Sequence, residues 1–69
     1  MTSQELRSLT IVANALNVAA TPAGGTIGDV RIRLVPRNGE PLETCDYEEA
    51  ASFLCDRYGR TETSRRVFR

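Results

Sequence analysis

Two cysteines and a run of acidic residues lie in the segment CDYEEAASFLCDRYG, residues 45–59, and these side chains have the most evident chemistry in the sequence. A cysteine nucleophile needs a neighbouring base, and the sequence contains no histidine. If the segment is helical, Cys45 and Cys55 lie about 15 Å apart along the axis, too far for a disulfide. We therefore predict two free thiols and no catalytic residue. Cys55 is expected in the core, and Cys45 is the candidate for a reactive thiol or thiol-based switch.

The acidic residues of this region are interpreted in the same way. Paired carboxylates perform acid–base chemistry when a pocket raises the pKa of one of them, and a chain of 69 residues has little volume for such a pocket. An exposed acidic face is instead suited to a basic partner surface. The candidate partner-binding acids are Glu43, Glu48 and Glu49.

The C-terminal segment RTETSRRVFR, residues 60–69, is rich in arginine and contains one phenylalanine. Three interpretations are open: a solvated terminus, an arm that anchors on a protein, and an arm whose arginines contact phosphates while an aromatic ring stacks on a base. The protein-binding candidates are Arg65, Arg66, Phe68 and Arg69. The alternative nucleic-acid-binding candidates are Arg57, Arg60, Arg65, Arg66 and Arg69.

No cofactor and no metal ion are expected. Two cysteines without a histidine cannot complete a zinc site, and no CxxC spacing is present. The glycine-rich stretch TPAGGTIG, residues 21–28, has neither the ending of a P-loop nor the GxGxxG order of a dinucleotide site. Its composition favours a flexible hinge.

Size and charge restrict the class of protein. A chain of 69 residues forms one domain, and such a domain buries only about 60% of the surface that its unfolded form exposes. We therefore expect extra stabilisation from self-association, as a homodimer, or from a protein partner. Nine arginines balance nine acidic residues, which argues against a protein built mainly to hold nucleic acid. No apolar run is long enough for a membrane span, so we expect a cytoplasmic protein with no membrane partner.

The expected elements follow from capping residues and hydrophobic spacing. Thr2 and Glu5 have the spacing of a capping box before a helical apolar stripe, and the alternation of Val30, Ile32 and Leu34 predicts a half-buried strand. The β-branched residues near Ile11 leave a strand as the alternative to the first helix. The predicted fold class is α+β, in the order αββα: helix 3–19, Gly/Pro hinge 20–28, hairpin 29–45, helix 46–58 and basic tail 59–69.

In outline, the chain resembles the small W-type head-completion proteins of tailed phages. The similar parts are the capped start MTSQEL, the strand–turn–strand VRIRLVPRNGEPLET, the capped helix DYEEAASFL and the basic end SRRVFR. The resemblance implies a structural role in a phage assembly, and small phage-encoded inhibitors of host proteins share the same format. The leading hypothesis is a non-enzymatic protein-interaction module of phage or mobile-element type, which modulates a host protein or joins an assembly. The alternatives are a nucleic-acid-binding regulator and the head-completion role.

Overall fold

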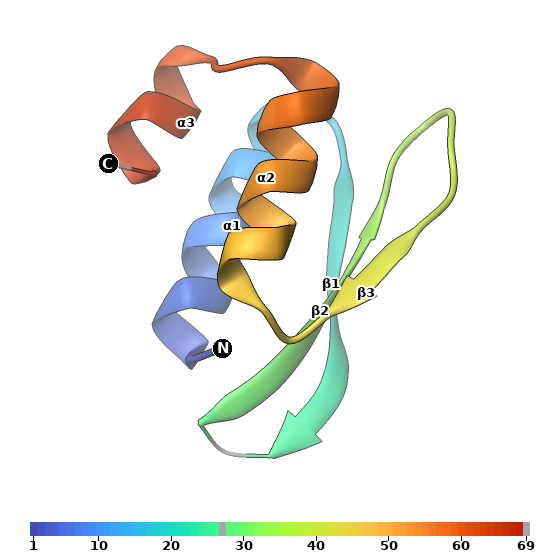
Figure 1. Ribbon diagram of the computed structural model, residues 1–69, viewed down its shortest axis with the longest axis vertical. Helices are drawn as coiled ribbons and strands as arrows, with labels where there is room; N and C mark the ends of the chain where they lie inside the picture. Colours follow the sequence, from blue (N-terminus) through green and yellow to red (C-terminus); the bar gives the residue numbers. More distant parts are fainter. Residues whose placement is uncertain (27, 69) are drawn as a thin grey trace.

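The computed structural model describes residues 1–26 and 28–68 and has the predicted α+β class (Figure 1). Its order is αβββαα, so the described chain has one strand and one short helix more than the sequence predicts. The elements are α1 (Ser3–Ala15), β1 (Ala19–Thr26), β2 (Asp29–Val35), β3 (Leu42–Thr44), α2 (Tyr47–Tyr58) and α3 (Glu62–Val67).

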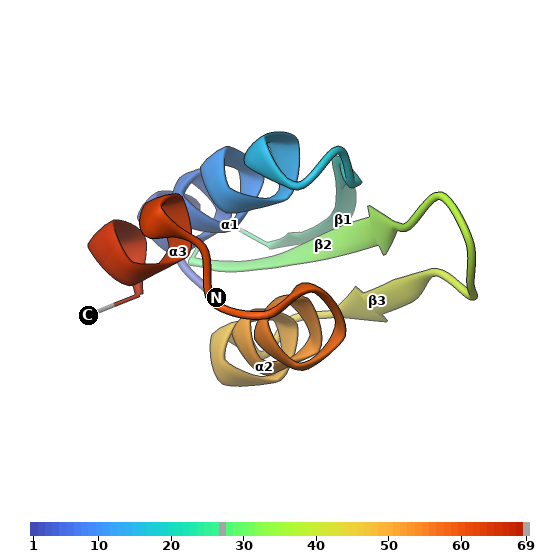
Figure 2. The same cartoon turned by 90° about the horizontal axis from the view of Figure 1, so that it is seen from above.

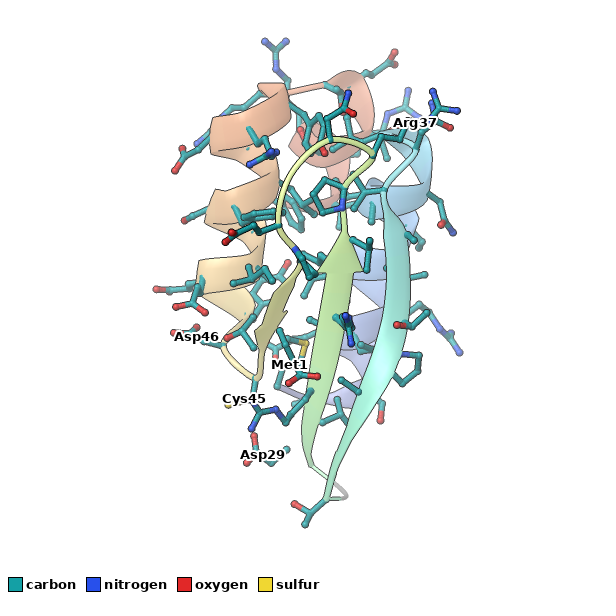
Figure 3. The ribbon with its side chains drawn as sticks, turned by 90° about the vertical axis from the view of Figure 1, so that its right-hand side faces the viewer. Met1, Asp29, Arg37, Cys45 and Asp46 are labelled. Atoms are coloured by element: carbon teal, nitrogen blue, oxygen red, sulfur yellow. The ribbon has the colours of Figure 1, made fainter. Side chains whose placement is uncertain are left out.

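The three strands form an antiparallel sheet in the order β1-β2-β3, with β2 in the centre. The helices lie on one face of this sheet, as Figures 1 and 2 show: α1 packs on β1 and β2, and α2 lies beside β3. The short helix α3 packs against α1 on the same side. Figure 3 shows the other face of the sheet, which no helix of the described chain covers.

The hydrophobic core lies between the sheet and the helices. The predicted alternation of β2 is confirmed, because Ile32 and Leu34 are fully buried while Arg31 and Arg33 are exposed. Each fully buried aliphatic side chain of this size contributes about 1.5–3 kcal/mol relative to an exposed one. The buried apolar residues are Met1, Leu9, Val12, Ala13, Val18, Ile32, Leu34, Ala50 and Leu54.

The predicted hinge over residues 20–28 is wrong, because most of this stretch is the edge strand β1. Pro22 is tolerated there since an edge strand can turn its missing donor toward solvent. The pairing with β2 is irregular between Pro22 and Gly25, where a bulge interrupts the register. Gly25 has a φ of 105°, and a Cβ at this position would overlap the carbonyl oxygen of Asp29. The glycines therefore permit a bulged strand, where the composition suggested a loop. Residue 27 lies outside the described residues.

The first helix is confirmed but ends at Ala15, four residues before the predicted end at residue 19. The predicted capping box is present, with the Thr2 hydroxyl accepting from the Glu5 amide and the Glu5 carboxylate accepting from the Thr2 amide. The hydroxyl of Thr10 donates to the Leu6 carbonyl, so this β-branched residue is accommodated inside the helix. The chain leaves the helix through Asn17, whose φ of 60° is a left-handed conformation that asparagine tolerates well.

The predicted hairpin over 29–45 and the helix over 46–58 are both present, with shorter boundaries. In the hairpin, Leu34 pairs with Leu42 and Arg33 with Glu43. The side chain of Asp46 caps α2 by accepting from the Glu48 amide at 3.0 Å. Gly59 ends α2 with a φ of 75°, as predicted from its position.

The α-amino group of Met1 is held between distant parts of the chain. It donates to the Cys45 carbonyl at 2.7 Å, to Oδ1 of Asp29 at 3.3 Å and to the Val30 carbonyl at 3.4 Å. In the other direction, the Val30 amide donates to the Met1 carbonyl at 2.9 Å. Met1 is 8% exposed and belongs to the core. The start of the chain therefore joins β2 to the end of β3, and Figure 3 shows Met1, Asp29 and Cys45 at this end of the sheet.

Candidate functional site

The C-terminal segment, for which the sequence allowed three interpretations, forms the helix α3, which packs against α1. Thr61 and Ser64 form a capping box at the start of α3, and Ser64 is 2% exposed. The Phe68 ring meets the Tyr47 ring edge to face, with 5.9 Å between centroids. Burial, and in second place the nearby Glu5 carboxylate, raise the pKa of Tyr47 above its ordinary value. The tail therefore folds back to the start of α2.

A hollow of about 260 Å³ lies between α2 and α3. Partly buried groups such as Ala51, Cys55 and Phe68 contribute apolar surface to it, and Asp56 and Arg60 bring one charge of each sign. The lining residues are Ala51, Ser52, Cys55, Asp56, Arg60, Ser64 and Phe68.

The two helices beside this hollow carry opposite charges on their exposed sides. Glu48 and Glu49 are exposed on the first turn of α2, where they also complement the positive end of the helix dipole. Arg65 and Arg66 are exposed on α3, and Nη2 of Arg66 lies 2.7 Å from Oε1 of Glu62. We use the name α2–α3 face for the hollow together with exposed charged residues of α2, of α3 and of the turn between them: Glu48, Glu49, Asp56, Arg60, Glu62, Arg65 and Arg66. Of these, Asp56 and Arg60 line the hollow itself, while helical spacing turns Glu62 and Arg66 away from Ser64, which also lines it.

Of the predicted partner-binding residues, Phe68 lines the hollow, Glu48 and Glu49 lie on α2, and Arg65 and Arg66 lie on α3. Glu43 lies elsewhere. Glu43 lies on β3, between Leu42 and Thr44, whose side chains point to the core side of the sheet. Its own side chain therefore lies on the face that no described helix covers, opposite Arg33 and 3.9 Å from Nη2 of Arg31. Arg69 is outside the described residues.

Arg57 has a structural contact that the sequence did not indicate. Its Nη2 donates to the Asn38 carbonyl at 2.5 Å, and its guanidinium lies over the Phe53 ring, 5.7 Å from the centroid. Gly39 has a φ of 141°, and a Cβ there would overlap this guanidinium. Arg57 therefore fastens the β2–β3 loop to α2. Among the nucleic-acid-binding candidates, Arg57 and Arg66 are thus already paired with groups of the protein.

Both cysteines are free, as predicted. Cys45 is exposed, and its backbone carbonyl accepts the shortest hydrogen bond from the Met1 ammonium. Cys55 is only partly buried, and it lines the hollow on the flank of α2 where a core position was expected. The prediction of a core Cys55 is therefore wrong in detail, since the buried positions of this helix are Ala50 and Leu54.

None of the helices in residues 1–26 and 28–68 has the length and apolar character needed to cross a membrane. Within the same ranges, no three cysteine, aspartate or glutamate side chains are grouped so that they could hold a metal ion.

Fold and surface together define a small α+β domain with a three-stranded antiparallel sheet, helices on one face, and an α2–α3 face that carries both signs of charge around a hollow. Comparison with protein-family models, with curated proteins and with solved structures finds no match for this chain. The likeness in outline to W-type head-completion proteins therefore stays a hypothesis.

Proposed function

We propose that this chain is a non-enzymatic protein-binding module that engages its partner through the α2–α3 face. The observation that carries the proposal is the hollow between α2 and α3, which Phe68 lines and to which Asp56 and Arg60 bring one charge of each sign. The exposed Glu48 and Glu49 of α2 and the exposed Arg65 and Arg66 of α3 are the further charged candidates on these two helices. A small protein with this surface is suited to the role of a phage or mobile-element product that modulates a host protein or joins an assembly.

The composition of the face supports protein recognition. Phe68 and Ala51 offer partly exposed apolar surface inside a concave region, which is where the residues that dominate binding energy usually lie. The surrounding arginines and carboxylates are exposed, so they are suited to steer and orient a partner of complementary charge.

The same features favour a protein over a nucleic acid as the partner. Arg66 is already paired with Glu62, and the formal net charge of zero gives no overall attraction for phosphates. A nucleic-acid partner would show binding that falls steeply with salt and is lost after nuclease treatment.

The test is capture of partners from a lysate of the source organism by the tagged protein, with and without nuclease. Arg65→Ala/Arg66→Ala should weaken capture at least about tenfold while the melting temperature stays within about 2 °C of wild type, because both side chains are exposed. The matched control is Arg7→Ala/Arg37→Ala, which removes two exposed arginines from α1 and the β2–β3 loop and should leave capture unchanged. Equal capture by both double variants would contradict the proposed face, and capture that disappears with nuclease would assign the partner to nucleic acid.

A further inference from the structure

We propose that the hollow between α2 and α3 is a site for an indole ring, which the protein partner supplies as a tryptophan side chain. The inference rests on the proposed function, because it names the group of the partner that the α2–α3 face binds. Two features of the hollow point to this ring: its volume and the chemistry of the residues that line it.

The hollow has room for an aromatic group of two fused rings. Figure 1 shows α2 and α3 joined by a short turn at one end of the molecule, and the hollow lies between them. Its volume is about 260 Å³, whereas a protein cavity of about 150 Å³ holds one benzene molecule. The small side chains of Ala51 on α2 and Ser64 on α3 leave this space open. An indole therefore fills the hollow better than a single ring does.

Two side chains of the hollow are suited to the ring system itself. Phe68 lines the hollow, and its ring already meets the Tyr47 ring edge to face, with 5.9 Å between centroids. A further aromatic ring gains from the same kind of contact. Arg60 brings a guanidinium cation, and indole is the aromatic side chain whose face attracts a cation most strongly. Both contacts favour an aromatic anchor over an aliphatic one.

The carboxylate of the hollow requires a donor on the ring. Asp56 lines the hollow, and an ionised carboxylate only accepts hydrogen bonds. The buried hydroxyl of Ser64 is already satisfied, because it donates to the Thr61 carbonyl at 3.0 Å and accepts from the Thr61 amide at 2.9 Å. Indole has one N–H donor and no acceptor. It can therefore satisfy Asp56 without needing a second bond from Ser64.

Both charges of the hollow are available to a ligand. Among residues 1–26 and 28–68, neither Asp56 nor Arg60 forms an ion pair, and both are exposed. Arg66 on α3, by contrast, is held by Glu62 at 2.7 Å. The entering ring therefore breaks no ion pair of the described chain when it contacts these two side chains.

Titration of the isotope-labelled chain with indole, followed by NMR, tests the site directly. We expect amide shifts that cluster at the residues lining the hollow, with a dissociation constant of about 1–10 mM, as a ligand of this size permits. Absence of any shift at these residues with indole up to about 20 mM, twice the weakest affinity expected, would overturn the inference.

Blocking the ring nitrogen tests the hydrogen bond to Asp56. N-methylindole keeps the ring but lacks the donor, so it should bind at least about fivefold more weakly than indole. Asp56→Ala should weaken indole binding by a similar factor and leave N-methylindole binding unchanged. The control Glu40→Ala removes an exposed acid from the β2–β3 loop and should change neither affinity. Equal binding of the two compounds by the wild-type chain would refute an indole oriented by Asp56.

A filled hollow gives a second readout. Ala51→Leu adds three carbon atoms at a lining position, in a helix that accommodates both residues well. It should abolish the indole shifts and weaken partner capture at least about tenfold. The control Ala15→Leu makes the same change at an exposed position of α1 and should alter neither. Indole binding that persists in an Ala51→Leu chain with a wild-type melting temperature would overturn the site. The comparison with Asp56→Ala does not depend on the folding of this variant.

The proposed function and the indole site fail in different ways. A hollow that does not bind indole, in a chain whose partner capture is still weakened by Arg65→Ala/Arg66→Ala, would refute the indole site and leave the proposed function. A hollow that binds indole as expected, in a chain whose capture is unchanged by both Arg65→Ala/Arg66→Ala and Ala51→Leu, would refute the proposed function and leave the indole site.

Discussion

The hydrogen bonds of the Met1 ammonium lead to the sharpest prediction about stability. Adding Gly-Ser before Met1 changes an ammonium with three N–H donors into an amide with one. At least two of the three bonds, to Cys45, Val30 and Asp29, are then lost inside the folded chain. Hydrogen bonds to a charged group contribute about 1.5–3 kcal/mol each. The bond to the Asp29 carboxylate contributes less, about 0–1 kcal/mol, because that side chain is exposed. We expect a loss of about 2–4 kcal/mol.

This loss is a large part of the total stability. A domain of 69 residues has about 3–10 kcal/mol in all, and its melting temperature should fall by about 10–25 °C. The assay is thermal unfolding followed by circular dichroism, on samples whose intact mass shows that Met1 is present. The same dipeptide added after Arg69 is the control and should change little. An N-terminal extension that leaves the melting temperature within about 2 °C of wild type would refute the reasoning, because a shift that small corresponds to well under 1 kcal/mol.

Three further predictions concern other contacts. Gly39→Ala should lower the free energy of unfolding by about 1–3 kcal/mol, because residue 39 has a φ of 141° and the added Cβ would overlap the Arg57 guanidinium. The loss, measured by urea denaturation, should be smaller in an Arg57→Ala background, and equal losses in both backgrounds would show that the overlap is relieved at no cost. The raised pKa of Tyr47 means that the fold favours the neutral phenol, so this contribution to stability is fully present below a pH of about 10 and is lost as the pH rises through the folded-state pKa. The melting temperature should therefore fall less steeply with pH in this range for Tyr47→Phe than for wild type, and parallel curves of melting temperature against pH would contradict the assignment. Phe68→Ala should lower the free energy of unfolding by about 0.5–1.5 kcal/mol through loss of the aromatic pair with Tyr47. It should also speed amide hydrogen exchange in α3 but not in α2, and unchanged exchange would show that α3 packs without the ring.

The elements with strong local signals were predicted well. Helix α2 has an acidic cap at Asp46 and ends at Gly59, and both features act within a few residues, so a single sequence shows them. The strand β2 alternates because one face is buried and the other is not. By contrast, β1 has the sequence AATPAGGT, whose proline and glycines indicate a turn. Only pairing with β2 makes it a strand, and pairing is a tertiary property.

The candidate residues were named from the sequence, but their arrangement was not. The acidic residues of α2 and the arginines of α3 were identified as charged groups, whereas the hollow between the two helices depends on the turn at Gly59 and on the contact of Phe68 with Tyr47. The hydrogen bonds from Met1 to Cys45 and from Arg57 to Asn38 join residues 44 and 19 positions apart. Neither pair has a local pattern, since a carbonyl acceptor exists at every residue. Only the spatial arrangement selects these partners.

The strand β1 also has a consequence for aggregation. Natural edge strands often carry lysines or other charges that discourage growth into fibrils, and residues 19–26 carry none. The resistance of this edge to intermolecular sheet formation therefore depends on the backbone, through the proline ring of Pro22 and the bulge that follows it. A chain that replaced Pro22 with a strand-forming residue would keep its charge, its core and the bulge at Gly25, yet it would present to its neighbours in a concentrated solution an uncharged edge that has lost one of its two protections.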